Sequence, residues 1–103
     1  LAVQQCFPTA ELQIEIVRET RVKARLTISE DHFVDLFFRK ETGRVDYALI
    51  VNDRRMFGID NLGGWHEHPL NDPESHKPCS ELTPTEAIRR LREAYDAVKV
   101  EAS

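Results

Sequence analysis

Apolar and polar residues alternate with a period of two through much of residues 1–60. Successive side chains of a strand point to opposite faces, so this alternation predicts β-strands. The segments with this pattern, or with an apolar run between turn residues, are 11–16, 21–28, 33–39, 45–51 and 55–59. The break near Glu19 fits either a bend in one long strand or a hairpin turn. A helix over 9–18, capped by Thr9, is the alternative for the first strand.

The end of the chain changes to the three- and four-residue spacing of an amphipathic helix. Thr83 stands at the N-cap, Pro84 at the first helical position and Glu86 three residues after the cap, which is the pattern of a capping box. The apolar stripe that would face a sheet consists of Ile88, Leu91, Tyr95 and Val98. This pattern predicts a C-terminal helix over residues 83–101.

Strands first and a helix last predict the α+β class. Short turns between successive strands favour antiparallel neighbours. We therefore expect a twisted antiparallel sheet of four to five strands in meander order, with the helix packed on it. The 103 residues suffice for a single domain with one core. Its predicted parts are an N-terminal arm (1–10), the sheet (11–60), a His-, Gly- and Pro-rich loop (61–82) and the helix (83–101).

The net charge of −4 lies wholly in residues 60–103, because acids and bases balance over 1–59. A protein that binds polyanions usually has the opposite balance, so the global charge argues against nucleic acid and leaves only local basic patches. No apolar segment is long enough to span a bilayer, and no signal peptide opens the sequence. Cys6 and Cys79 are typical of reduced thiols. We expect a cytoplasmic protein without a membrane partner.

The predicted loop concentrates residues that bind metals. It holds three of the four histidines and one of the two cysteines, in the order HxH…HxxC. Histidine and thiolate are the ligands that zinc prefers, and short-range pairs joined by a loop are the usual construction. The candidate ligands are His66, His68, His76 and Cys79. The spacing lacks the paired CxxC knuckles of a strong zinc signature, so the alternatives are a zinc site and no cofactor.

The same histidines suit general acid–base chemistry. Imidazole titrates near neutrality, so a pair of histidines can take up and return protons, as cleavage of a phosphodiester requires. His66 and His68 would share one face of an extended segment, and Asp60 is placed to orient an imidazole. Arg54 and Arg55 are nearby bases able to contact phosphate. The candidate catalytic residues are Asp60, His66, His68 and His76.

Each of these residues also has a purely structural interpretation. Trp65 is typical of a side chain that anchors a loop on the core, and the histidines can hold the loop to the sheet through hydrogen bonds. Cys79 in most contexts behaves as a small apolar residue. Arg21, Lys23 and Arg25 lie on one face of a predicted strand, where they either follow a nucleic-acid backbone or form a solvated surface.

Several short motifs together resemble the TumE-type toxins, a family of small prokaryotic proteins. They are residues 55–61 (RMFGIDN), 63–69 (GGWHEHP), His76 and 84–86 (PTE). The resemblance covers roughly residues 20–95. It implies a toxin whose partner is a helix-turn-helix antitoxin. The site positions that it carries over are Asp60, Asn61, Trp65, His66, His68 and His76, of which Asn61 and Trp65 join Arg54 and Arg55 as expected binding residues.

Two functional hypotheses follow. In the first, the protein is the toxin of a toxin–antitoxin pair and acts on RNA, or on a component of translation, through His66, His68 and His76. In the second, it is a non-enzymatic structural or protein-binding domain whose His/Cys loop is a structural anchor or a zinc site. A homodimer through an exposed edge strand is compatible with both hypotheses.

Overall fold

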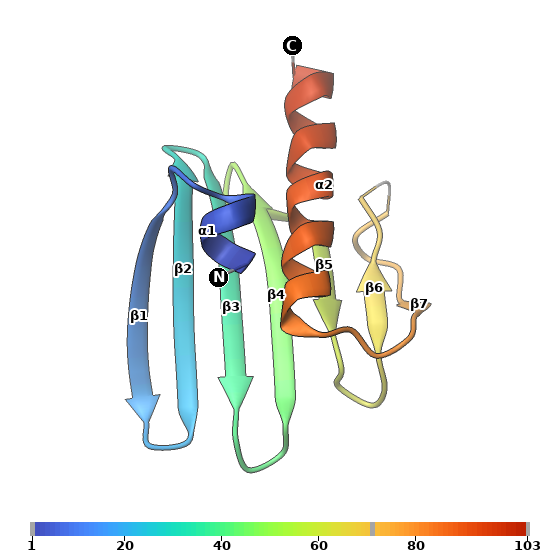
Figure 1. Ribbon diagram of the computed structural model, residues 1–103. Coiled ribbons are helices and arrows are strands. Elements are labelled where there is room, and N and C mark those ends of the chain that lie inside the picture. Colours follow the sequence, from blue (N-terminus) through green and yellow to red (C-terminus); the bar gives the residue numbers. More distant parts are fainter. Residues whose placement is uncertain (1, 71, 103) are drawn as a thin grey trace.

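The protein is described by a computed structural model that covers residues 2–70 and 72–102. It consists of one seven-stranded antiparallel sheet, whose strands lie side by side in sequence order, and two helices (Figure 1). The elements are α1 (Ala2–Cys6), β1 (Glu11–Arg18), β2 (Arg21–Ser29), β3 (His32–Arg39), β4 (Arg44–Val51), β5 (Arg54–Asp60), β6 (His66–His68), β7 (Lys77–Pro78) and α2 (Pro84–Ala102). The predicted α+β class, meander order and C-terminal helix are confirmed. The antiparallel pairing of β1 with β2 selects the hairpin turn over the long bent strand and over the helix.

The sheet is larger than predicted because segment 61–82, expected to be a loop, adds two strands to its edge. β6 pairs with β5, and β7 pairs with β6. Strands of three and two residues are too short to show an alternating pattern, and the surrounding glycines and prolines favour a loop. The predicted N-terminal arm likewise contains the short helix α1.

Both helices pack on the same side of the sheet, which we call the helix face (Figure 1). The core lies between the sheet and the helices. The fully buried side chains of the sheet core include Leu26, Val34, Leu49 and Ile59. The predicted stripe of α2 is buried against them, at Ile88, Leu91, Tyr95 and Val98. The capping box also forms: the Glu86 N–H donates to Thr83 Oγ1, and the Thr83 N–H donates to Glu86 Oε1, each at 3.2 Å.

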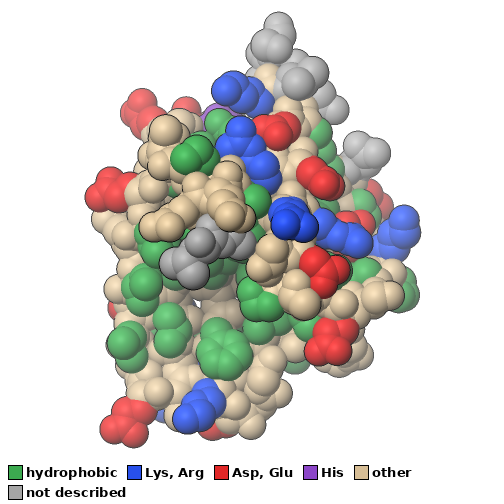
Figure 2. Space-filling view, viewed as in Figure 1, with side chains coloured by type: hydrophobic (Ala, Val, Ile, Leu, Met, Phe, Trp, Pro, Cys, Tyr) green, Lys and Arg blue, Asp and Glu red, His purple; other side chains and the backbone are tan. Residues whose placement is uncertain are grey.

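The helices leave part of the helix face uncovered beside the edge strand β1. Figure 2 shows apolar side chains gathered on this part of the surface. The exposed large apolar residues of β1 and β3 are Leu12, Ile14, Ile16, Val17 and Phe38. Among the described residues, no helix combines the length and apolar character that a membrane crossing requires.

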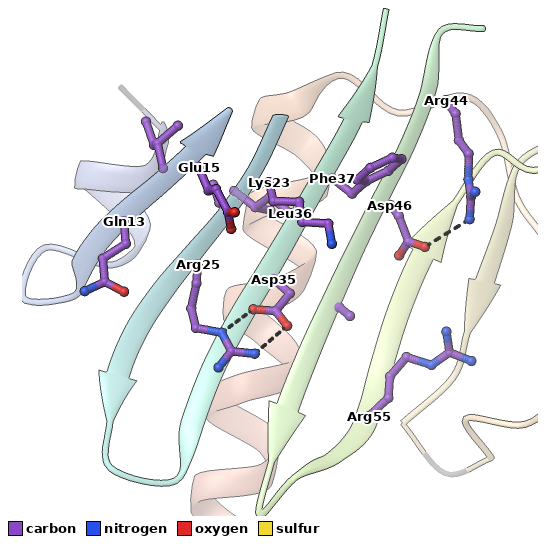
Figure 3. A pocket seen from close by; sticks show the side chains of 13 residues that line it. Gln13, Glu15, Lys23, Arg25, Asp35, Leu36, Phe37, Arg44, Asp46 and Arg55 are labelled. Carbon is purple, nitrogen blue, oxygen red and sulfur yellow. Dashed lines mark hydrogen bonds and ion pairs between the residues drawn. The ribbon is translucent and has the colours of Figure 1, made fainter. Parts of the chain in front are cut away.

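The opposite side of the sheet, which we call the open face, is not covered by either helix. Its side chains alternate along each strand with those of the core, and many of them are charged. In Figure 3 they stand in front of the sheet, while α2 lies behind it. The regular register of the long strands aligns these residues across the sheet, and this alignment positions the candidate site.

Candidate functional site

Residues directly opposite each other on neighbouring strands share a face and lie in a row across the sheet. The strand register defines three such rows on the open face. The first, which we call the arginine row, is Arg18–Arg21–Arg39–Arg44. The second is Glu15–Lys23–Phe37–Asp46–Asp60–His66, and the third is Gln13–Arg25–Asp35–Ala48–Gly58–His68. The predicted histidines therefore share a face with a cross-strand line of four arginines.

His68 is held by the carboxylate of Asp60, the residue that we expected to orient an imidazole. Its Nε2 lies 2.7 Å from Asp60 Oδ2, and the side chain of His68 is only 2 % exposed. The other oxygen of Asp60 accepts the Leu62 N–H at 3.0 Å. Burial raises the pKa of Asp60, but the hydrogen bonds from His68 and Leu62 outweigh it and hold the pKa below its ordinary value. The pair thus contains an ionised carboxylate at neutral pH.

The second nitrogen of His68 also has partners. Nδ1 lies 3.2 Å from the carbonyl oxygen of Pro73 and 3.4 Å from Nη2 of Arg55. A protonated Nδ1 donates to the carbonyl, and an unprotonated Nδ1 accepts from the guanidinium, so the ring is satisfied in both states. Gly58 lies next to both side chains, because a Cβ there would stand 3.4 Å from the His68 ring and 3.5 Å from Arg55. The tightest contact of such a Cβ would be with the Tyr47 carbonyl oxygen, at 3.3 Å.

His66 and His76 complete a compact group with His68, which we call the histidine cluster. The His66 and His76 ring centroids are 5.4 Å apart, and those of His68 and His76 are 4.5 Å apart, both edge to face. His66 Nδ1 lies 2.6 Å from the Gly64 carbonyl oxygen, so this nitrogen carries a proton, and in the neutral ring the lone pair is on Nε2. His66 is partly exposed and His76 is exposed. His66 and His76 are therefore the accessible members of the cluster, and His68 is its buried member.

A hollow of about 740 Å³ opens on the same face (Figure 3), and one of its lining residues, Arg55, also lies 3.4 Å from His68 Nδ1. Its floor includes the small residue Ala48, and Arg55 and Arg44 stand at its wall with the acids Asp35 and Asp46. Burial and the neighbouring Asp60 carboxylate raise the pKa of Asp46, although Arg44 and Arg55 act against this. The hollow has a mixed polar and apolar lining and contains cations that a ligand can reach.

The arginines of the row differ in how far they are neutralised. Arg39 pairs with Glu41 at 2.8 Å, and Arg44 lies 3.7 Å from Asp46. Among the described residues, neither Arg18 nor Arg21 has a carboxylate partner. The Nε atoms of Arg21 and Arg44 are buried and have no hydrogen-bond acceptor in the described part of the chain. Like charges directly opposite each other are unfavourable in a sheet, so an anionic ligand on this row would stabilise it.

Aromatic rings lie between the charged side chains of the open face. The guanidinium of Arg25 lies 4.5 Å from the centroid of the Phe33 ring, and that of Arg44 lies 5.6 Å from the centroid of Phe37. Arg25 also forms a two-point pair with Asp35 at 2.7 and 2.8 Å. Flat guanidinium groups on aromatic rings offer stacking surfaces for bases.

Of the predicted site residues, Arg55 lines the hollow, whereas Asn61, Trp65 and Arg54 do not. Asn61 uses both polar atoms on the backbone of the β3–β4 hairpin: Oδ1 accepts the Val45 N–H at 2.9 Å, and Nδ2 donates to the Gly43 carbonyl at 3.0 Å. Trp65 is partly buried against the core. Arg54 is exposed at the far end of β5 from Asp60. Asn61 therefore fixes the site in place, and Arg55, rather than Arg54, reaches the histidines.

The structure lends the zinc hypothesis no support. The described residues contain no group of three or more His, Cys, Asp and Glu side chains arranged to hold a metal ion. Both nitrogens of His68 already face other partners. Burial raises the pKa of the partly buried Cys79, which disfavours the thiolate that zinc requires.

The arginine row was not predicted, because it depends on strand register. Arg18 and Arg21 flank one hairpin turn, and Arg39 and Arg44 flank another. Residues that flank a tight turn pair across it, so a correct prediction of each turn also predicts its arginine pair. The β2–β3 pairing that joins Arg21 to Arg39 had no such local signal.

Comparisons with models of protein families, with curated proteins and with solved structures each gave no match. The resemblance to the TumE-type toxins stays a prediction. The geometry of the open face is therefore the basis on which a function can be argued.

Proposed function

We propose that the protein binds single-stranded RNA across the open face of its sheet and cleaves it, as the toxin of a toxin–antitoxin pair. The observation that carries this proposal is the arginine row, which lies on the same face as the histidine cluster. Neighbouring strands are about 4.8 Å apart, so four arginines in a row span about 14 Å, enough to contact more than one phosphate. Guanidinium groups stacked on Phe33 and Phe37 provide surfaces for the bases.

The acidic net charge of the chain does not oppose this proposal, because the three aligned rows of the open face contain more bases than acids. Helix α2 on the helix face holds four acids and four bases, so the excess of acids lies in residues 60–81. The open face carries the arginine row together with Lys23, Arg25 and Arg55. A polyanion that approaches the open face therefore meets a local field that differs from the average of the chain.

His66 is the proposed general base, because it alone combines a free Nε2 with partial exposure and a fixed tautomer. In the proposed reaction, Nε2 takes the proton of a ribose 2′-hydroxyl, and the 2′-oxygen bonds to the adjacent phosphorus. The bond from phosphorus to the 5′-oxygen breaks, and the leaving oxygen receives a proton from His76. The buried His68 and its partner Asp60 position the other two histidines and do not touch the substrate.

A second candidate function is a non-enzymatic binding domain. The observation that favours it is the burial of His68, whose two nitrogens are both engaged by the protein. Under this hypothesis the Asp60–His68 pair only ties β6 to β5 and holds the following segment through Pro73. The two candidates differ in one measurable respect, which is whether His66 is needed for RNA cleavage.

The test uses purified protein and an end-labelled single-stranded RNA of mixed sequence. His66→Gln should bind this RNA as the wild type does, and should lose cleavage by about 100-fold or more. Arg21→Gln/Arg39→Gln should lose binding by at least tenfold. Arg89→Gln/Lys99→Gln removes the same charge from exposed positions of α2 and serves as the matched control. Cleavage that persists in His66→Gln would reject the catalytic role, and a folded wild type that binds no RNA would reject the whole proposal.

A further inference from the structure

Strand β1 is an open edge of the sheet. All eight of its residues are exposed, and β2 pairs with only one of its sides. Its side chains on the helix face are apolar, and Ile14 and Ile16 are 63 % and 69 % exposed. Within β1, no proline interrupts this edge and no charged residue points to the helix face, and each of these would help to block an edge strand. The one irregularity, at Val17, lies next to the last residue of the strand. The edge is therefore open to another strand.

We propose that a second copy of this chain pairs its β1 with β1 in antiparallel fashion, about a two-fold axis that passes through Ile14. The pattern of the strand itself points to this occupant. A β-bulge at Val17 places Arg18, rather than Val17, opposite the next residue of β2. Counted on the register of the sheet, Glu11 and Arg18 consequently stand at equal distances from Ile14, three positions away on either side.

This symmetry makes β1 complementary to itself on both faces. On the helix face, Ile14 meets its own copy, and Leu12 meets Ile16 of the other chain. On the open face, the Gln13 amide meets the Glu15 carboxylate, and Glu11 meets Arg18, so that each dimer contains two of each polar pair. These partners follow from the register positions of the residues on the two faces.

The neighbouring registers lack this complementarity. An axis through Gln13 would place Glu11 opposite Glu15, and an axis through Glu15 would place that carboxylate opposite itself. An axis between two residues would bring together side chains that point to opposite faces of the sheet. Among these registers, charge therefore favours the one centred on Ile14, which also pairs the whole length of the strand. The pairing gives Arg18, which has no carboxylate partner among the described residues, an acidic partner in Glu11 of the other chain.

The dimer extends the sheet through both copies and keeps both pairs of helices on one side, because the two-fold axis is perpendicular to the sheet. The two open faces then adjoin. The pairing does not depend on the proposed RNA binding, and a protein that fails to bind RNA can still form this dimer. One pair of eight-residue strands is a small interface, so the dimer should exchange with monomer in a concentration-dependent manner.

Cysteine cross-linking tests the register. In a Cys6→Ser/Cys79→Ser background, Ile14→Cys should form a disulfide-linked dimer on mild oxidation, because directly opposite Cα atoms lie within about 6 Å, the span of a disulfide. Gln13→Cys alone, at a neighbouring position that is also exposed, should remain monomeric on a non-reducing gel. A mixture of Gln13→Cys and Glu15→Cys should cross-link. Equal cross-linking of Ile14→Cys and Gln13→Cys alone would overturn the proposed register.

A charge exchange tests the same pairing without altering the native cysteines. Glu11→Arg and Arg18→Glu should each weaken self-association in sedimentation by about tenfold, because two like-charge contacts replace two ion pairs. The double variant Glu11→Arg/Arg18→Glu should regain the wild-type association. A wild type that stays monomeric at about 0.5 mM would overturn the proposal and leave this edge to a strand of a different protein. A double variant no better than the single variants would overturn the Glu11–Arg18 pairing.

Discussion

The carboxylate of Asp60 links the end of β5 to the last residue of β6 and to the turn between the two strands. One oxygen holds His68 on β6, and the other accepts the amide of Leu62 inside the turn. The side chain of Asp60 is nearly buried, so its loss leaves a polar ring and an amide without their partner. A single residue thus couples the stability of this edge of the sheet to the orientation of the histidine cluster.

This coupling predicts a pH-dependent stability that an amide cannot reproduce. The pKa of Asp60 is lower in the folded protein than in the unfolded chain, so its contribution is fully present above the ordinary value of about 3.9 and is lost as the pH falls through the lower folded value. Asp60→Asn should therefore be less stable at neutral pH and should lose less stability between about pH 5 and pH 2. Urea unfolding midpoints across this range measure both effects.

The control for this measurement is Asp31→Asn, which changes an exposed carboxyl in the β2–β3 turn. It should follow the wild type across the whole pH range. If Asp60→Asn and the wild type gave parallel curves, the hydrogen bond to His68 would not favour the ionised carboxylate, and the positioning role of Asp60 would be lost.

The sequence predicted the composition of the histidine cluster better than its accessibility. The i, i+2 spacing placed His66 and His68 on one face, and the structure confirms it through their pairing with Asp60 and Gly58. Burial of His68 depends on Pro73, on Arg55 and on the small residue Gly58, which reach it from other parts of the fold. No local sequence pattern indicates these contacts, so the sequence alone does not distinguish the buried His68 from the accessible His66.

At the scale of the elements, helix α2 begins where the sequence predicted because its first turn is defined by local chemistry. Thr83 and Glu86 satisfy each other's backbone amides, and the N-cap needs no contact from the rest of the molecule. The same locality explains the confirmed strands, which are long enough to show a period of two. β6 and β7 depend instead on an edge offered by β5, and a sequence pattern of two or three residues cannot show that.

The capping box gives the second prediction. Thr83→Ala should lower the free energy of unfolding by about 1 kcal/mol, because the amide of Glu86 loses its side-chain acceptor. Thr83→Ser keeps the hydroxyl and should stay close to the wild type. Urea unfolding followed by circular dichroism compares the three proteins. Equal losses in the alanine and serine variants would show that the methyl group of Thr83, and not its cap, is what stabilises the helix.

At the scale of the whole molecule, the proposed toxin activity predicts growth arrest. Expression of the wild type from a tightly controlled promoter should stop bacterial growth, whereas His66→Gln should not, provided that both proteins accumulate in folded form. His66 is the suitable position because it is partly exposed, and its substitution leaves the buried Asp60–His68 pair intact. Arrest by both proteins would place the toxic activity outside the histidine cluster.

The open face and the helix face also contribute differently to the electrostatic field around the molecule. A polyanion bound on the open face should release counterions from the phosphates that the arginine row contacts, so its affinity should fall steeply with salt. For a single strand, the slope of log K against log salt concentration changes by about 0.7 for each phosphate contact.

Arg21→Gln/Arg39→Gln should therefore reduce the magnitude of the slope by about 1.4. Arg89→Gln/Lys99→Gln should leave it unchanged, because these residues lie on α2 behind the sheet. Equal reductions in both double variants would mean that RNA contacts the protein without regard to face, and that the alignment of the four arginines does not define the binding surface.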